Sequence, residues 1–298
     1  MEFEHVRGLA ADLGTPEPVT LPERTRVTVG DRDISMVAWG TDAVVTAFHG
    51  GGLNAHSWDA TLLHLDLSAV AFDLPGHGHS SWRTDARYTP ETLAADLGPA
   101  LHSLHLTSQV VVGHSIGALT GLLVAAQNPE LAAALVMIDA TPSPDPTAMA
   151  AVRRIFAGPS SFESYEEAAR WATGLGLGTT AASLEQGLRF NMREREDGRV
   201  VFRHHLAHLE PDASAPAWDE SQLWSAAASL AVPLLIIRGT HGFVSEADAA
   251  RFADHCANAR IVTIDGGHNV HHNSPGAVAA AIRSFADEIG VLTPHSPA

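Results

Sequence analysis

The residues with the clearest chemical meaning lie in the motif GHSIG at positions 113–117. Ser115 stands between two glycines, after the apolar run QVVV (109–112) and before the apolar stretch IGALTGLLVAAQ. This context is typical of a serine on a tight strand-to-helix turn, where larger flanking side chains would collide with the neighbouring strand and helix. A helix that begins after Ser115 directs N–H groups and its positive dipole end toward developing negative charge. We therefore predict that Ser115 is a nucleophile and that Ile116 is an oxyanion donor.

A second glycine motif, HGGG at positions 49–52, follows the apolar run VTAF (45–48) and precedes a stretch of helical length. Consecutive glycines let the main chain approach a substrate oxygen closely and expose its N–H groups. We expect Gly51, alone or together with Gly52, to supply one oxyanion donor and Ile116 the other. A flexible turn is the alternative interpretation.

A base for the serine is expected in GGHN at positions 266–269, which follows the apolar run RIVTI (260–264). A loop in this place lies at the carboxyl end of a strand, where open α/β sheets bind their ligands. The chain has eighteen histidines, so position in the chain and not residue type selects the candidate. We predict His268 as the base, with His271 and His272 as alternatives.

The elements that must position these residues are visible as a regular alternation. Short apolar runs without polar alternation indicate strands buried on both faces, as in a parallel sheet: VTAF (45–48), VAF (70–72), QVVV (109–112), ALVMI (134–138), LLII (234–237) and RIVTI (260–264). RVTV (26–29) and ISMVAW (34–39) flank a Gly-Asp pair and predict an antiparallel edge hairpin. Segments of helical length separate the strands: 54–65, 90–106, 115–127, 246–256 and 275–289. The pattern predicts an eight-stranded, mostly parallel, doubly wound α/β sheet.

The alternation stops between Thr141 and Ala231, where Ala, Glu, Arg and aromatic residues dominate and prolines stand at both ends. We interpret residues 142–229 as a helical lid inserted into a core formed by residues 1–141 and 230–298. A disordered linker is the alternative.

Four landmarks carry a resemblance to a known family: HGGGLNAHSW, DLPGHGHS, GHSIGALTGLL and GGHN, in this order. Together they resemble the α/β-hydrolase superfamily over the whole core, and the chain looks most like small bacterial carboxylesterases, enol-lactonases and carbon–carbon bond hydrolases. The resemblance implies Ser115 as nucleophile, His268 as base, and Gly51 and Ile116 as oxyanion donors, with no metal and no organic cofactor. Dehalogenases and epoxide hydrolases of this fold use an aspartate nucleophile, and Ser115 argues against both activities.

The acid of the expected triad is the member that departs from the usual pattern. In many such sheets it follows the strand after the lid, but this chain has Gly242 and Phe243 there. An acid has only to orient the imidazole and stabilise its cation, so the end of the preceding strand can also supply it. We predict Asp139, which ends ALVMID, with Glu246 and Asp248 as alternatives.

Composition excludes several other classes of function. A formal charge of −16 with only 18 Lys and Arg residues argues against nucleic acid and against an anionic membrane surface as partners. No apolar run reaches the ~20 residues that a membrane span needs. The polar start MEFEHVRGLA does not resemble a secretory signal, so we expect a cytoplasmic protein, as a monomer or homodimer. A single cysteine excludes an intramolecular disulfide.

The reaction we expect is hydrolysis of an ester, lactone or related carbonyl-centred bond of a small molecule through an acyl-enzyme. Amide or carbon–carbon bond hydrolysis, cofactor-independent oxygenation and a lyase-type reaction of the His–Asp pair are alternatives, as is a non-catalytic binding module. We expect no metal at the histidine group His204, His205 and His208. The substrate is either uncharged or a carboxylate held by lid arginines, for which the candidates are Arg153, Arg154, Arg189, Arg193 and Arg195.

Overall fold

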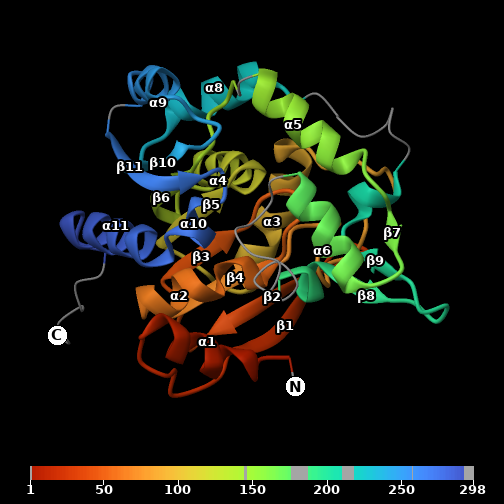
Figure 1. The fold of residues 1–298 in the computed structure, drawn as a ribbon. Helices are drawn as coiled ribbons and strands as arrows, with labels where there is room; N and C mark the ends of the chain where they lie inside the picture. Colours follow the sequence, from red (N-terminus) through yellow and green to blue (C-terminus); the bar gives the residue numbers. More distant parts are fainter. Residues whose placement is uncertain (1, 144–145, 176–186, 210–217, 257, 292–298) are drawn as a thin grey trace.

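A computed structural model describes residues 2–143, 146–175, 187–209, 218–256 and 258–291. Its centre is an eight-stranded sheet in the order β1-β2-β4-β3-β5-β6-β10-β11 (Figure 1). Strand β2 is antiparallel to β1 and β4, and all other neighbours are parallel. The bounds are β1 (Glu23–Val29), β2 (Arg32–Trp39), β3 (Val45–Phe48), β4 (Ala69–Phe72), β5 (Gln109–His114), β6 (Ala132–Ile138), β10 (Leu234–His241) and β11 (Ala259–Gly267). The predicted eight-stranded, mostly parallel sheet is confirmed.

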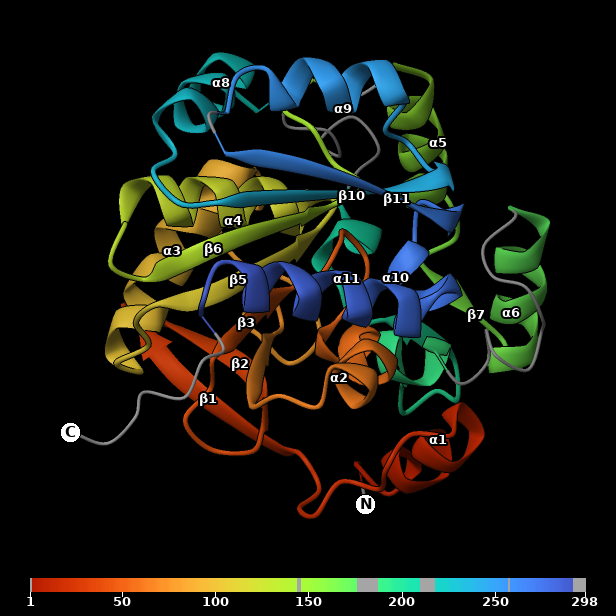
Figure 2. The same cartoon turned by 90° about the vertical axis from the view of Figure 1, so that its left-hand side faces the viewer.

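Both faces of the sheet are covered by helices, which explains why the central strands are apolar without alternation. Val111 points into the core formed with α3 (Pro90–Ser103), α4 (Ile116–Gln127), α8 (Glu220–Ser229) and α9 (Glu246–Ala253). Its neighbours Val110 and Val112 point into the opposite core, formed with α1 (His5–Leu13), α2 (Asp59–Leu65) and α11 (Pro275–Glu288), the last of which lies in front of the sheet in Figure 2. Among the described residues, no helix is long and apolar enough to cross a membrane.

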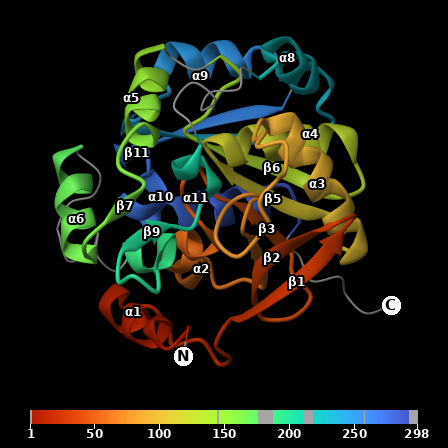
Figure 3. The ribbon, with the colours of Figure 1, turned by 90° about the vertical axis from the view of Figure 1, so that its right-hand side faces the viewer.

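The segment predicted as a lid lies to one side of the sheet (Figures 1 and 3). Its elements there are α5 (Pro146–Phe156), β7 (Ser161–Phe162), α6 (Tyr165–Gly174), β8 (Met192–Glu194), β9 (Val200–Phe202) and η2 (His205–His208). The last element within residues 142–229, α8, packs instead in the main core through Leu223 and Ala227. Beyond the expected helices, it contains an antiparallel sheet in the order β7-β9-β8, which the sequence analysis did not anticipate. Phe162, Met192 and Phe202 belong to a small hydrophobic core within this segment, separate from the two cores of the main sheet. Positions 176–186 and 210–217 of the predicted lid lie outside the described residues.

Two short elements near the carboxyl ends of the strands connect the sheet to the site. The 3-10 helix η1 (Ala55–Trp58) begins directly after the HGGG segment, where the Asn54 side chain accepts a hydrogen bond from the His56 N–H at 2.8 Å. The short helix α10 (Val270–Asn273) follows His268 and leads into α11. The glycine segment and the His268 loop are therefore each followed within a few residues by a short helix.

Candidate active site

Ser115 occupies the bend between β5 and α4. Its backbone has φ 54° and ψ −125°, a conformation that non-glycine residues rarely adopt and that costs about 1–3 kcal/mol. A Cβ at Gly113 would overlap with Ala118, and one at Gly117 would overlap with the main-chain oxygen of His49. Both glycines of GHSIG are thus required by close backbone contacts, as the motif predicts.

The structure brings His268 and Asp139 together. The His268 Nδ1–H donates to Asp139 Oδ2 at 2.7 Å, and the Asp139 side chain is fully buried at the end of β6. The carboxylate also accepts main-chain N–H groups from Gly239 at 3.3 Å, Phe243 at 2.6 Å and Val244 at 3.4 Å. Main-chain donors stabilise the ionised carboxylate and fix its rotation, so the imidazole has a defined orientation.

The two residues that stand in place of the usual acid have a structural explanation. A Cβ at Gly242 would overlap with Asp139 Oδ1, so only glycine leaves room for the carboxylate that approaches from β6. The Phe243 ring stacks on the His268 ring, with centroids 3.9 Å apart and planes at 15°. The acid on β6 and a side chain at position 242 therefore exclude each other, which the sequence alone did not reveal.

His114, the residue directly before Ser115, contacts the loop that carries His268. Its Nε2–H donates to the main-chain oxygen of His268 at 3.0 Å, and the two rings lie 4.6 Å apart. Burial, with smaller contributions from neighbouring histidines including His268 and His272, holds the pKa of His114 well below its usual value, so the ring is neutral. The motif GHSIG contains this histidine but does not by itself indicate this contact.

The HGGG segment runs alongside the bend at Ser115. A Cβ at Gly50 would lie 3.3 Å from the Ser115 Cβ and 2.5 Å from His114 Nδ1, and one at Gly51 would lie 4.0 Å from the Ile116 side chain. Ile116 is the first residue of α4, so its N–H has no acceptor within the helix. The glycine segment and the start of α4 thus lie close together beside Ser115.

The buried ring of His49 fixes the HGGG segment through two hydrogen bonds. Its Nδ1–H donates to the Gly50 main-chain oxygen at 2.7 Å, and its Nε2 accepts the Leu74 N–H at 2.9 Å. Burial lowers the pKa of His49 to about 4, against the opposing effects of the Gly50 hydrogen bond and of Asp73, so the ring stays neutral at physiological pH. The HGGG motif includes His49 but does not indicate these two hydrogen bonds or the tautomer that they require.

Residues of the lid segment cover Gly51 and Gly52. A Cβ at Gly52, where φ is +76°, would lie 3.2 Å from the Phe156 ring and 3.7 Å from His204 Nε2. Phe156 belongs to α5, and His204 precedes η2. The segment predicted as a lid therefore contacts the core at Gly51 and Gly52.

The alternative bases and acids lie elsewhere. His271 is buried against Trp58, and neither of its ring nitrogens has a hydrogen-bond partner in the described part of the chain, while His272 donates to the Ser57 main-chain oxygen at 3.0 Å. Glu246 is exposed, and the Asp248 carboxylate accepts a hydrogen bond from the hydroxyl of Ser245, the residue that caps α9. None of these four contacts the Asp139–His268 pair through a hydrogen bond.

The other histidines and arginines singled out from the sequence are engaged locally. His205 is hydrogen-bonded to the Tyr88 hydroxyl at 2.7 Å, and His208 donates to the Phe202 main-chain oxygen at 2.9 Å. Arg195 forms an ion pair with Asp197 at 2.8 Å. Arg189 lines a cavity beside the site together with Arg24 and Arg203, whereas Arg153 and Arg154 lie exposed in the last turn of α5.

A family model for the alpha/beta hydrolase fold matches residues 44–275, most of the chain. The chain belongs to this family. It is an enzyme of the α/β-hydrolase fold.

Two relatives are similar over nearly the full chain. An esterase of Mycobacterium tuberculosis, Rv0045c, is 35% identical, covering 96% of this chain and 96% of its own. A crystal structure of that esterase superposes with a TM-score of 0.82 at 32% identity, covering 96% of this chain and 98% of the other. The 2-(acetamidomethylene)succinate hydrolase of Mesorhizobium japonicum is 26% identical, covering 94% of this chain and 99% of its own.

Proposed function

We propose that this α/β-hydrolase is a serine esterase that acts on a small molecule through an acyl-enzyme, with Ser115 as nucleophile, His268 as base and Asp139 as acid. The observation that carries the proposal is the bond from the His268 Nδ1–H to the buried, fully hydrogen-bonded Asp139 carboxylate, on a loop that His114 ties to the Ser115 bend. The similarity to a named esterase at 35% identity supports the ester as the bond cleaved.

The proposed reaction follows from the tautomer of His268. Because Nδ1 carries the proton donated to Asp139, Nε2 has the lone pair that accepts the Ser115 hydroxyl proton. The serine oxygen then bonds to the carbonyl carbon, and the carbonyl oxygen becomes an anion that the Gly51 and Ile116 N–H groups stabilise. The imidazolium returns the proton to the leaving alcohol, and the same histidine deprotonates the water that releases the acid and regenerates Ser115.

The residues of the lid segment that cover the glycines favour an apolar part of the substrate there. Phe156 and His204 lie over Gly51 and Gly52, and burial lowers the pKa of His204 to about 3, so this wall is aromatic and uncharged. A neutral aromatic wall suits the apolar part of an ester. Cationic side chains gather instead in the neighbouring cavity lined by Arg24, Arg189 and Arg203.

The decisive test is Ser115→Ala against a matched Ser284→Ala variant on the outer helix α11. We expect Ser115→Ala to lower kcat for short p-nitrophenyl esters by roughly 10⁴-fold or more, while circular dichroism stays unchanged, because the nucleophile is lost and the fold is not. A fluorophosphonate should label the wild type and Ser284→Ala but not Ser115→Ala. Hydrolysis by Ser115→Ala at near wild-type rate would overturn the nucleophile assignment. A panel of esters, lactones and amides then ranks the bond types.

A further inference from the structure

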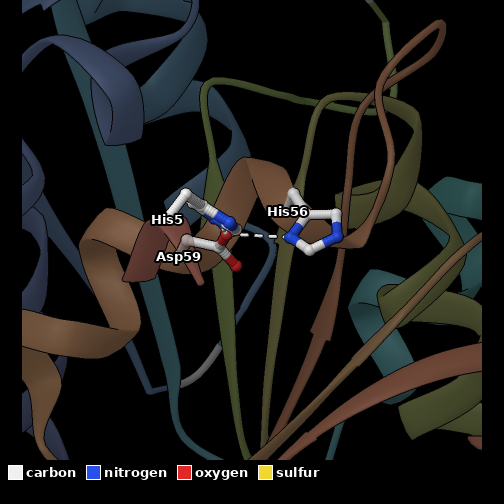
Figure 4. A group of neighbouring side chains, drawn as sticks. All are labelled: His5, His56 and Asp59. Carbon is white, nitrogen blue, oxygen red and sulfur yellow. Dashed lines mark hydrogen bonds and ion pairs between the residues drawn. The ribbon is translucent and has the colours of Figure 1, made fainter. Parts of the chain in front are cut away.

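A second group of polar side chains lies outside the Ser115 site, where α1 meets η1 and α2. His5 comes from α1, His56 from η1 and Asp59 from the first turn of α2 (Figure 4). His5 Nε2 lies 2.7 Å from Asp59 Oδ2, and His56 Nδ1 lies 2.8 Å from the same oxygen. The proposed hydrolysis uses none of these residues.

The outer hydrogen bonds of both rings determine which nitrogens carry protons. His56 Nε2 lies 3.0 Å from the Glu2 carboxylate oxygen, and His5 Nδ1 lies 2.9 Å from the Glu2 main-chain oxygen. Both oxygens only accept, so in these two hydrogen bonds the nitrogens are the donors. Arg24 also approaches His56 Nε2, at 3.3 Å, but it forms its ion pairs with Glu2 and Asp73.

A neutral imidazole has one N–H group, so the inward nitrogens of His5 and His56 then present lone pairs. The ionised carboxylate of Asp59 presents another lone pair to both of them. Three acceptors facing one another at hydrogen-bond distance require either a second proton on each ring or a cation between them. One divalent ion has the same charge as the two protons.

We propose that His5 Nε2, His56 Nδ1 and the Asp59 carboxylate bind one divalent transition-metal ion of the Zn²⁺ class. Two histidines and one carboxylate are a donor set that zinc prefers, and the two hydrogen bonds to Glu2 orient the rings as outer partners of metal-bound histidines do. Metal–ligand bonds of about 2.0 Å in tetrahedral geometry need ligand atoms ~3.3 Å apart, so the side chains have to separate by roughly half an ångström.

An unsatisfied oxygen supports the site independently. Asp59 is buried with 3% of its surface exposed, and its Oδ1 has no hydrogen-bond partner among the described residues. A buried acceptor without a partner costs free energy, because it has lost its water without replacement. Rotation of the carboxylate toward a metal ion gives this oxygen a ligand.

A cavity reaches one of the three ligands. It has a volume of about 320 Å³ and is lined by Glu2, His56 and Phe190 among other residues. The Phe190 ring stacks on His56 with centroids 4.1 Å apart and contacts His5 at 4.7 Å. A bound ion therefore joins the amino-terminal helix to the segment that follows the oxyanion glycines, beneath an aromatic side chain of the lid segment.

The proposal departs from the expectation, drawn from the sequence, that the chain has no metal site. His5 lies about fifty positions before His56 in the chain, so no local spacing indicates this group of ligands. The histidines of the lid segment, by contrast, stand close together in the sequence. Only the packing of α1 on α2 brings the ligands together.

The experiment uses the full chain after EDTA treatment and removal of the chelator. Calorimetric titration with Zn²⁺ should give one ion per chain, Co²⁺ should produce visible absorption bands, and Zn²⁺ should raise Tm because it binds the folded state. We expect His5→Gln to weaken zinc binding at least tenfold and to remove the Tm increase. Asp59→Asn should do the same, and it decides the matter if His5→Gln does not fold.

Two controls locate the ion. His102→Gln removes an exposed histidine that lies 3.3 Å from Glu130, a comparable pair without a third ligand, and should bind zinc as the wild type does. His268→Gln alters the proposed reaction centre and should also bind zinc normally. Absence of stoichiometric binding by the wild type at micromolar zinc, wild-type affinity in both site variants, or loss of binding only in His268→Gln would each overturn the proposal.

Discussion

Two groupings of histidine with aspartate in this molecule use the same residue types in different ways. The Asp139 carboxylate receives three main-chain N–H groups and one imidazole, so nearly all of its hydrogen-bonding capacity is used. The Asp59 carboxylate faces two imidazoles through one oxygen, and its other oxygen has no partner in the described structure. A saturated carboxylate suits the orientation of one ring, and an unsaturated one suits a cation.

The two groupings also differ in what positions them. Ser115, Asp139 and His268 stand at the carboxyl ends of β5, β6 and β11, so the central sheet sets their spacing. His5 stands on a peripheral helix, and its distance from Asp59 depends on how α1 docks on α2. Substitutions that disturb the first grouping should therefore act on turnover, and those that disturb the second should act on stability.

After Ser115→Ala, the largest effect is expected from Asp139→Asn. The amide keeps the shape but cannot stabilise an imidazolium, and it favours the wrong tautomer of His268, so kcat should fall by roughly 10³- to 10⁴-fold. Steady-state ester hydrolysis measures this. Asp248→Asn, a substitution of a half-buried alternative acid, is the matched control and should leave kcat unchanged. If only Asp248→Asn lowered kcat, the acid would belong to α9 and not to β6.

A smaller effect is expected from Gly242→Ala. The added methyl group would overlap with Asp139 Oδ1 and push the carboxylate away from His268. Because a misplaced acid orients His268 less well, kcat should fall by about 10- to 100-fold. Gly174→Ala is the control, because a Cβ there meets nothing within 4 Å. Equal kcat values for the two alanine variants would show that the space at position 242 has no bearing on the acid.

The contrast between the groupings also explains how far the sequence alone leads. Ser115 and His268 stand in local motifs beside apolar strands, so motif and pattern together predict their place at the sheet. Asp139 was selected because it ends a strand beside the nucleophile strand, a consequence of topology. The role of Gly242 and the approach of His5 to Asp59 depend on segments distant in the chain, which no local pattern encodes.

The lid segment shows a different limit of the sequence. Strands β7, β8 and β9 have only two or three residues each, which is too short for an alternation to be recognised, and their apolar side chains pack against one another and not into the main core. Short strands of this kind become visible only when their partners are known.

The smallest effect is one of pH on stability, and it separates two buried histidines. Burial would lower the pKa of His56, but its ion pair and hydrogen bond with Asp59 and its hydrogen bond to Glu2 outweigh burial and the opposing charge of Arg24, raising it to about 9. At His49 burial prevails instead. The folded state thus favours protonated His56, and the stabilisation it provides is fully present below pH 6.5 and is lost as pH rises through about 9.

Urea denaturation in EDTA between pH 6.5 and 9.5 tests this. The free energy of unfolding of the wild type should fall by about 1–3 kcal/mol over this range. His56→Gln should be less stable than the wild type at pH 6.5, and its free energy of unfolding should change little as the pH rises. His102→Gln, which changes an exposed histidine, should follow the wild-type curve. Parallel curves for wild type and His56→Gln would mean that His56 carries no extra proton in the folded state. The charge between Glu2 and Asp59 would then have to come from His5 or from a bound ion.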